Sequence, residues 1–267
     1  MNSWHVPVSK TGQRSILDSS PKGTRCGSSS TMSNQPLSTI GIRMPQEFPT
    51  RPYEAVYRRL GNKRDSHPES FREFVSAWVT VAYRFLSCDE HNQAFSESVK
   101  RFGKTPLPLE RYVQERELYG FFVAGFSVIE SFCYGIFAIG SISKPKKFPF
   151  VTPVDKRKVS PEVTADKFGA VFKGESITTA LHSMRRSQDF RDWKNIRNIL
   201  SHRSTPGRHA FLGGDRNGEV IWGEKIPINE NTTASRFRWL VDTLDDLLDT
   251  ADEFTSVKLP WSTRQGL

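Results

Sequence analysis

Cysteine is scarce in this sequence, whose 267 residues include only Cys26, Cys88 and Cys133. The three are odd in number, lie far apart and form no CxxC pair. This pattern argues against a disulfide framework and against a zinc site, and it fits a reducing compartment. The first 20 residues also lack the apolar run of a secretory signal. We therefore expect a cytoplasmic protein that binds no metal.

Several familiar catalytic motifs are absent as well. The sequence contains no P-loop GKS/T, no HExxH, no GxSxG and no EF-hand loop. No spacing typical of metal ligands links His67, His91, His182 and His209. These absences leave no sequence signal for a cofactor, and none is expected.

Acidic residues are fewer than basic ones, 29 against 38, which gives a formal net charge of +9 and a sequence pI of about 9.6. A basic chain favours acidic partners such as nucleic acid, nucleotides or an anionic membrane surface. Much of the excess lies in residues 1–65, where 10 basic residues face 4 acidic ones. A basic tail on an otherwise indifferent domain is therefore an alternative interpretation.

The composition divides the chain into a tail and a domain. Residues 1–45 are rich in Ser, Thr, Gly and Pro, and bury too little apolar surface to offset their ordering entropy. We predict a disordered tail over residues 1–50, a helical domain over 51–257 and a second tail over 258–267.

Two long helices are predicted in the first half of that domain. Apolar residues recur at helical spacing from Phe71 to about Phe102, and a second helix runs from about Leu109 to Ser141. Between Leu118 and Ile142, Glu130 is the only charge. A stretch of this length suits a membrane span, but a central carboxylate is costly in lipid. We favour the central helix of a bundle and expect no membrane partner.

A Pro-rich, basic segment follows over residues 141–174, with 8 Lys and Arg against 3 acids. We predict a long loop inserted in the domain. A loop of this length that is merely solvated and an RNA-facing flap are equally open interpretations.

The second half of the domain predicts shorter elements. Helices are expected over residues 176–187, 190–203 and 234–254, the last capped by Asn231 or Thr232. Asn217-Gly218 between two apolar runs predicts a hairpin within residues 208–228. The expected fold is an all-α bundle of four to five helices, with a small β-hairpin after the fourth.

The helix over residues 190–203 has two distinct sides at about 100° per residue. The side expected to face the core carries Phe190, Trp193, Ile196, Ile199 and Leu200. A narrow polar stripe on the other side carries Arg191, Asn195, Asn198 and His202. Arg197 lies about 140° from His202, at the edge of the apolar side.

Within this helix, Arg197-Asn198-Ile199-Leu200-Ser201-His202 resembles the R-x4-H motif of the HEPN family (higher eukaryotes and prokaryotes nucleotide-binding domain). In that family the motif lies on a late helix of an all-α bundle. Many members are metal-independent endoribonucleases that dimerise with their motifs facing each other. The resemblance covers about residues 65–255, and the insertion 141–174 and the hairpin 208–228 depart from it.

The resemblance implies a set of functional residues. Arg197, Asn198 and His202 are the candidate catalytic residues of an endoribonuclease that uses the RNA 2′-hydroxyl as nucleophile. Glu130 matches the acidic residue that the family often carries in its middle helix, and we predict that it accepts hydrogen bonds from Arg197 or Asn198. RNA contacts are expected from Lys144, Lys146, Lys147, Lys156, Arg157, Lys158, Arg191 and Arg203.

The resemblance also implies a homodimer with facing motifs, which we predict, and it suggests an antitoxin or regulatory partner in a toxin or defence role. Two alternative interpretations stay open. The chain could be a non-catalytic HEPN-like module that binds RNA, a nucleotide or a protein. Alternatively, Arg197 simply pairs with an acid such as Glu130, and His202 caps the end of its helix.

Overall fold

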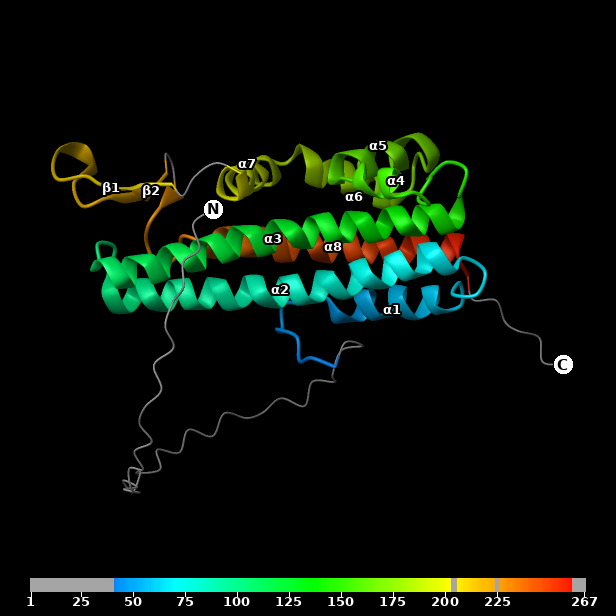
Figure 1. Cartoon of the computed structure of the whole chain (residues 1–267), viewed down its shortest axis with the longest axis horizontal. Coiled ribbons are helices and arrows are strands. Elements are labelled where there is room, and N and C mark those ends of the chain that lie inside the picture. Colours follow the sequence, from blue (N-terminus) through cyan, green and yellow to red (C-terminus); the bar gives the residue numbers. More distant parts are fainter. Residues whose placement is uncertain (1–40, 203–205, 224–225, 261–267) are drawn as a thin grey trace, which may run out of the picture. The chain divides into compact units, whose positions relative to one another are not determined.

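The computed structural model describes residues 41–202, 206–223 and 226–260. Within these ranges lie eight α-helices and three short strands that form one small antiparallel sheet (Figure 1). The predicted all-α bundle with a small hairpin is therefore confirmed.

Two long antiparallel helices form the centre of the bundle, α2 (Pro68–Phe102) and α3 (Pro108–Ser143). They lie side by side along most of their length (Figure 1). Both have proline in the first turn, where its missing N–H costs nothing. Gly103 follows α2 with a φ of 74°, which glycine adopts without strain. The two long helices predicted from the sequence are confirmed.

Helix α3 is the most apolar element of the described chain. It is the one helix in the described ranges that is long and apolar enough to cross a membrane by length and composition, and 72% of its apolar 18-residue window is buried. The burial comes from packing against α2, α5, α7 and α8. This packing is the role that the predicted central helix of a bundle requires.

The structure extends the folded part beyond both predicted boundaries. Helix α1 (Thr50–Gly61) was not predicted, and it packs on α2 and on α8 (Ala234–Lys258). Met44 and Phe48 are buried, so the prediction of a disordered tail is wrong for residues 41–50. Leu259 is also buried, so the C-terminal tail does not begin at 258. Residues 1–40 and 261–267 of the two predicted tails lie outside the described ranges.

The prediction of a long loop over residues 141–174 is wrong. The segment contains helices α4 (Pro153–Arg157) and α5 (Pro161–Val171) and is followed by α6 (Ser176–Arg186). It is anchored by aromatic side chains: Phe148 packs on Phe137 of α3, and Phe168 packs on Phe254 of α8. These rings bury the segment on the bundle, which its Pro-rich and basic composition concealed.

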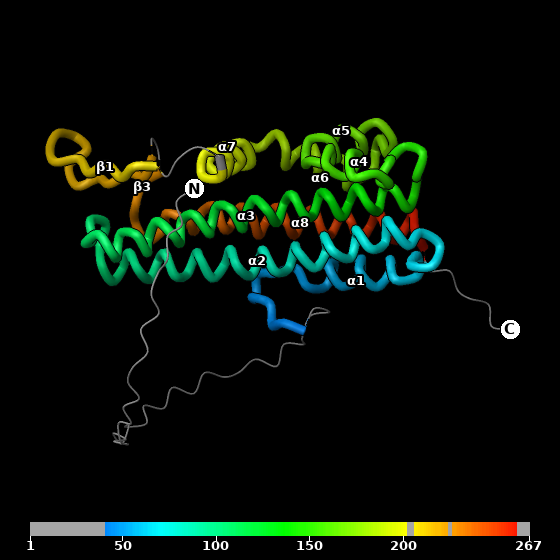
Figure 2. The backbone as a smooth tube through the Cα atoms, in the orientation of Figure 1, coloured from blue at the N-terminus to red at the C-terminus, as the bar shows by residue number. Residues whose placement is uncertain are grey.

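The last elements are α7 (Gln188–His202), the sheet and α8. Strands β1 (Arg208–Ala210), β2 (Val220–Trp222) and β3 (Ile226–Pro227) pair in that order, with Arg208 opposite Trp222. Figure 2 traces the backbone of this part of the chain in yellow to orange. The predicted hairpin is confirmed, although its loop is longer than the Asn217-Gly218 pair and holds a short 3-10 turn. The predicted cap of α8 is wrong, because its N-cap is Thr233 and makes no capping hydrogen bond.

Candidate functional site

Helix α7 carries the R-x4-H sequence and begins at a sharp corner after α6. The Ser187 hydroxyl accepts a hydrogen bond from the Phe190 backbone N–H at 3.1 Å, which satisfies one open donor of the first turn. The helix ends at His202, before Pro206-Gly207, as predicted. The side chain of His202, and Arg203 entirely, lie outside the described part of the chain.

The apolar side of α7 packs on α3 through two large rings. Phe190 and Trp193 are buried, and the Trp193 ring stacks on Phe121 with centroids 5.1 Å apart. The Trp193 indole N–H donates to the Phe122 carbonyl oxygen at 2.8 Å. An added Cβ on Gly125 would lie 2.1 Å from the Trp193 ring, so glycine is what admits the indole.

The rest of the predicted apolar face is less buried. Ile196 and Leu200 are half-buried and pack against the core. Ile199 is also half-buried and, together with Ile196, lines a surface pocket between α7, the sheet and the start of α8. The prediction of the apolar side is thus confirmed at the N-terminal end of α7 and weaker toward its C-terminus.

Arg197 forms an ion pair with Glu130 of α3, as predicted from the sequence. The Arg197 side chain is 18% exposed and that of Glu130 40% exposed. The guanidinium carbon of Arg197 also lies 4.5 Å from the centroid of the Phe126 ring, in cation–π geometry. The Arg197 Nε is buried without a hydrogen-bond partner. Arg197 is therefore held against α3, where it is mostly shielded from solvent.

Glu130 lies in a mixed electrostatic environment. Burial raises the pKa of its carboxyl and outweighs the opposing effect of Arg197, while Glu162 raises it further and Lys194 lowers it. Glu162 of α5 is itself bonded to Lys194 of α7. Two acids and two bases thus form one cluster across α3, α5 and α7, with no net charge.

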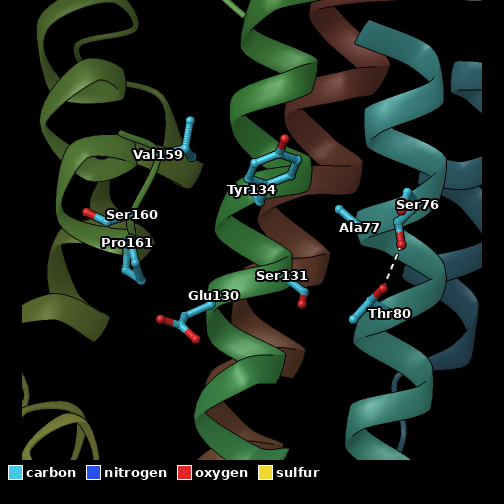
Figure 3. A pocket seen from close by; sticks show the side chains of 9 residues that line it. All are labelled: Ser76, Ala77, Thr80, Glu130, Ser131, Tyr134, Val159, Ser160 and Pro161. Atoms are coloured by element: carbon cyan, nitrogen blue, oxygen red, sulfur yellow. Dashed lines mark hydrogen bonds between the residues drawn. The ribbon is translucent and has the colours of Figure 1, made fainter. Parts of the chain in front are cut away.

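A pocket of about 350 Å³ lies beside Glu130, between α2, α3 and the start of α5 (Figure 3). The Glu130 carboxylate extends from α3 toward Ser160 and Pro161, away from the α2 wall. Tyr134, on the same α3 face, donates its hydroxyl to Glu73 at 3.0 Å. The lining of this pocket offers hydroxyls beside the Glu130 carboxylate and contributes no basic side chain.

A second pocket, of about 520 Å³, lies at the corner between α6 and α7, and we call it the basic pocket. Its polar lining residues are Glu162, Arg185, Arg186, Arg191, Lys194, Asn195 and Asn198. Two of its cations are paired with acids, Arg185 with Asp166 and Lys194 with Glu162. Arg191 bonds only the neutral Gln188 amide at 2.8 Å. Cations and amides of this kind suit phosphate oxygens.

The structure brings together only part of the predicted site. Arg191 and Asn198 line the basic pocket together, whereas Arg197, about 100° from Asn198 around α7, points toward Glu130. This separation follows the angular spacing of the residues along α7. One protomer does not place Arg197 and Asn198 around a common point.

Of the basic residues predicted to bind RNA in residues 144–158, Lys144, Lys146 and Lys147 lie at or just after the end of α3 and not beside Glu130. About 20 Å of helix separates Lys144, at the end of α3, from the level of Glu130. Lys156 donates to Glu73 at 2.7 Å, and this ion pair makes it unsuitable as a free RNA contact. The other five are exposed: Lys144, Lys146, Lys147, Arg157 and Lys158.

Sequence reasoning missed part of the basic pocket. Arg185 and Arg186 are adjacent in the last turn of α6, and this doublet was the available signal. It also missed a polar contact between the long helices, where His91 Nδ1 lies 2.7 Å from Glu117 Oε2 and Arg116 also bonds Glu117. Among the described residues, no three His, Cys, Asp or Glu side chains gather as metal ligands would.

No known family model, curated protein or solved structure matches this chain. The likeness to the HEPN family accordingly rests on the hexapeptide, its late helix and the acid that faces it.

Proposed function

We propose that this chain is a HEPN-like, metal-independent endoribonuclease with its site on α7. The observation that carries the proposal is the position of the R-x4-H sequence. It lies on a late helix that packs on the apolar central helix, with Arg197 against Glu130 and Asn198 in the wall of the basic pocket. The basic pocket provides cations for the RNA backbone next to the motif.

In the proposed reaction the 2′-oxygen of RNA attacks the adjacent phosphorus, and the bond from phosphorus to the 5′-oxygen breaks. The 2′-hydroxyl loses its proton to a base, and the departing 5′-oxygen gains one from an acid. His202 performs one of these transfers, and water performs the other. Arg197 stabilises charge on the phosphorane-like transition state, and Asn198 orients the substrate. The products are a 2′,3′-cyclic phosphate and a 5′-hydroxyl.

The test is cleavage of mixed RNA in EDTA by the wild type and by His202→Ala. We expect wild-type cleavage with 2′,3′-cyclic phosphate ends and at least a 100-fold slower rate in the variant. His209→Ala removes an exposed histidine on β1 and is the matched control, expected to cleave like the wild type. Equal cleavage by wild type and His202→Ala would assign the activity to a contaminant.

A second candidate function is favoured by the shielding of Arg197. The Arg197 guanidinium already contacts the Glu130 carboxylate and the Phe126 ring, so it is not free to contact a phosphate. The chain could therefore bind RNA in the basic pocket without cleaving it. Charge reversal at Arg186 and Arg191 should then lower the affinity for RNA and reduce how steeply that affinity falls as salt concentration rises. The control reverses Arg157 and Lys158 on and after α4. A larger loss in this control would assign RNA binding to the segment 144–158.

A further inference from the structure

Exposed apolar side chains are concentrated at the turn between α2 and α3. Ten large hydrophobic residues are exposed in the described ranges, and half of them lie within 18 residues: Phe102, Leu107, Leu109, Tyr112 and Tyr119. Three of these are strongly exposed, Leu107 by 73%, Leu109 by 69% and Tyr112 by 61%. A concentration of this kind marks an interaction surface more often than chance.

The turn holds these side chains outward. Leu107 is the N-cap of α3 in extended conformation, and Leu109 and Tyr112 follow on one face at a spacing of three residues. The Gln114 amide donates to the Gly103 carbonyl oxygen at 3.1 Å and so fixes the turn from within. Arg208 of β1 donates to the Lys104 carbonyl oxygen, also at 3.1 Å.

Cations accompany the apolar side chains. Lys100, Arg101 and Lys104 are exposed, and Arg101 lies over the Phe102 ring, 4.9 Å from its centroid. Two of the nearby acids are already paired, Glu115 with Arg111 and Glu117 with Arg116. The remaining acids near the turn are Glu97 and Glu110.

We propose that this turn is a peripheral contact with an anionic phospholipid bilayer. Leu107 and Leu109 enter the acyl boundary, Tyr112 lies at the headgroup level, and the three cations meet lipid phosphates. A second copy of the chain fits the surface less well, because three side chains expose far less than the roughly 800 Å² that each partner buries in a stable dimer. The proposal departs from our expectation of no membrane partner and does not depend on RNA cleavage.

The test is flotation of the full chain with vesicles of phosphatidylcholine alone or with 30% phosphatidylserine. We expect binding to the anionic vesicles only, weakened by 0.5 M salt. The variant Leu107→Ser/Leu109→Ser should lose at least 10-fold in bound fraction. Val151→Ser/Val257→Ser removes two comparably exposed apolar side chains elsewhere and should bind like the wild type.

The fold of each variant is checked by circular dichroism and thermal unfolding, and its mass by light scattering. Binding of the wild type to neither vesicle, or equal binding of both double variants, overturns the proposal. A dimer that Leu107→Ser/Leu109→Ser converts to a monomer assigns the turn to a second copy and also overturns it. Loss of RNA binding in Leu107→Ser/Leu109→Ser, with no vesicle binding by the wild type or any variant, assigns the turn to RNA and also overturns the proposal.

Discussion

The pairing of Arg197 with Glu130 is required by two different roles. A catalytic arginine needs an acid to orient it, and a purely structural arginine at a helix interface needs the same acid to compensate its burial. Burial raises the pKa of the Glu130 carboxyl despite the neighbouring Arg197 guanidinium. We therefore expect a neutral amide at position 130 to destabilise the folded protein less than alanine, which removes the hydrogen-bond acceptor of Arg197.

Glu130→Gln and Glu130→Ala should differ in stability and in pH dependence. A raised folded-state pKa means that the folded protein binds the proton more tightly than the unfolded chain. Wild-type stability from this group is thus greatest below the ordinary value of 4.5 and falls as pH rises through the raised pKa. Glu130→Gln has no carboxyl to ionise at this position and so does not lose this stability as pH rises. Its free energy of unfolding, measured in urea, should therefore increase relative to that of the wild type between pH 4.5 and 7.5.

Glu130→Ala leaves Arg197 without its acceptor and should cost about 1–2 kcal/mol. The cost is below that of a fully buried pair because the Glu130 side chain is 40% exposed. Glu219→Gln, which breaks the exposed pair with Arg216, is the control and should change stability little. Wild-type stability in Glu130→Ala at both pH values would contradict the pairing.

At this scale the sequence predicts contacts only where few alternatives exist. Glu130 was the one charge in an apolar helix, and Arg197 lay at the edge of an apolar face, so their meeting could be anticipated. The pairing of Lys194 with Glu162 could not, because it depends on where α5 lies. That position is set by Phe148, Phe168 and their ring contacts, which a single sequence does not reveal.

The element that positions the candidate site is α7, and its attachment depends on Trp193. The indole occupies the space that a side chain at position 125 would fill, and its N–H bonds the Phe122 carbonyl. Glycine within a helix normally lowers stability relative to alanine, by about 1 kcal/mol. Gly125 is therefore retained in α3 for packing and not for helix formation.

Gly125→Ala should destabilise the protein by at least about 2 kcal/mol, against the usual sign for a helix interior. The new methyl would lie 2.1 Å from the Trp193 ring, so the indole and α7 must move. Gly61→Ala, at the end of α1 with open space around it, is the matched control and should be neutral or slightly stabilising. Thermal unfolding with Trp fluorescence compares the two, and similar Tm values would contradict the packing argument.

Long elements with strong periodicity could be predicted, and short ones could not. The apolar stripes of α2 and α8 repeat over many turns, and α3 is apolar over a long continuous stretch, so each signal exceeds local noise. Helices α1, α4 and α5 have 12, 5 and 11 residues and begin after or at proline in segments that read as loops. Their helical state depends on tertiary packing more than on propensity.

At the scale of the whole molecule, the two proposed catalytic residues whose side chains the structure describes have different neighbours. Arg197 contacts α3 and Asn198 lines the basic pocket. A two-fold axis at α7 would combine residues from two protomers into composite sites. The proposed dimer is thus a requirement of the proposed reaction, and light scattering of the full chain should detect it.

A composite site can be tested by complementation between two inactive variants. Arg197→Gln and His202→Ala should each lack activity as homodimers. After unfolding and refolding as an equal mixture, half of the dimers carry one chain of each kind. If a site takes Arg197 from one chain and His202 from the other, each such dimer holds one intact site, and activity should return to about a quarter of the wild-type value.

Two controls define this result. Each variant refolded alone must stay inactive and must show the wild-type helical content by circular dichroism. A mixture that stays inactive although mass analysis shows mixed dimers would place Arg197 and His202 of one chain in the same site. Since α7 directs Arg197 toward α3, that outcome would require Arg197 to leave Glu130 before cleavage, and Glu130→Gln should then accelerate the reaction.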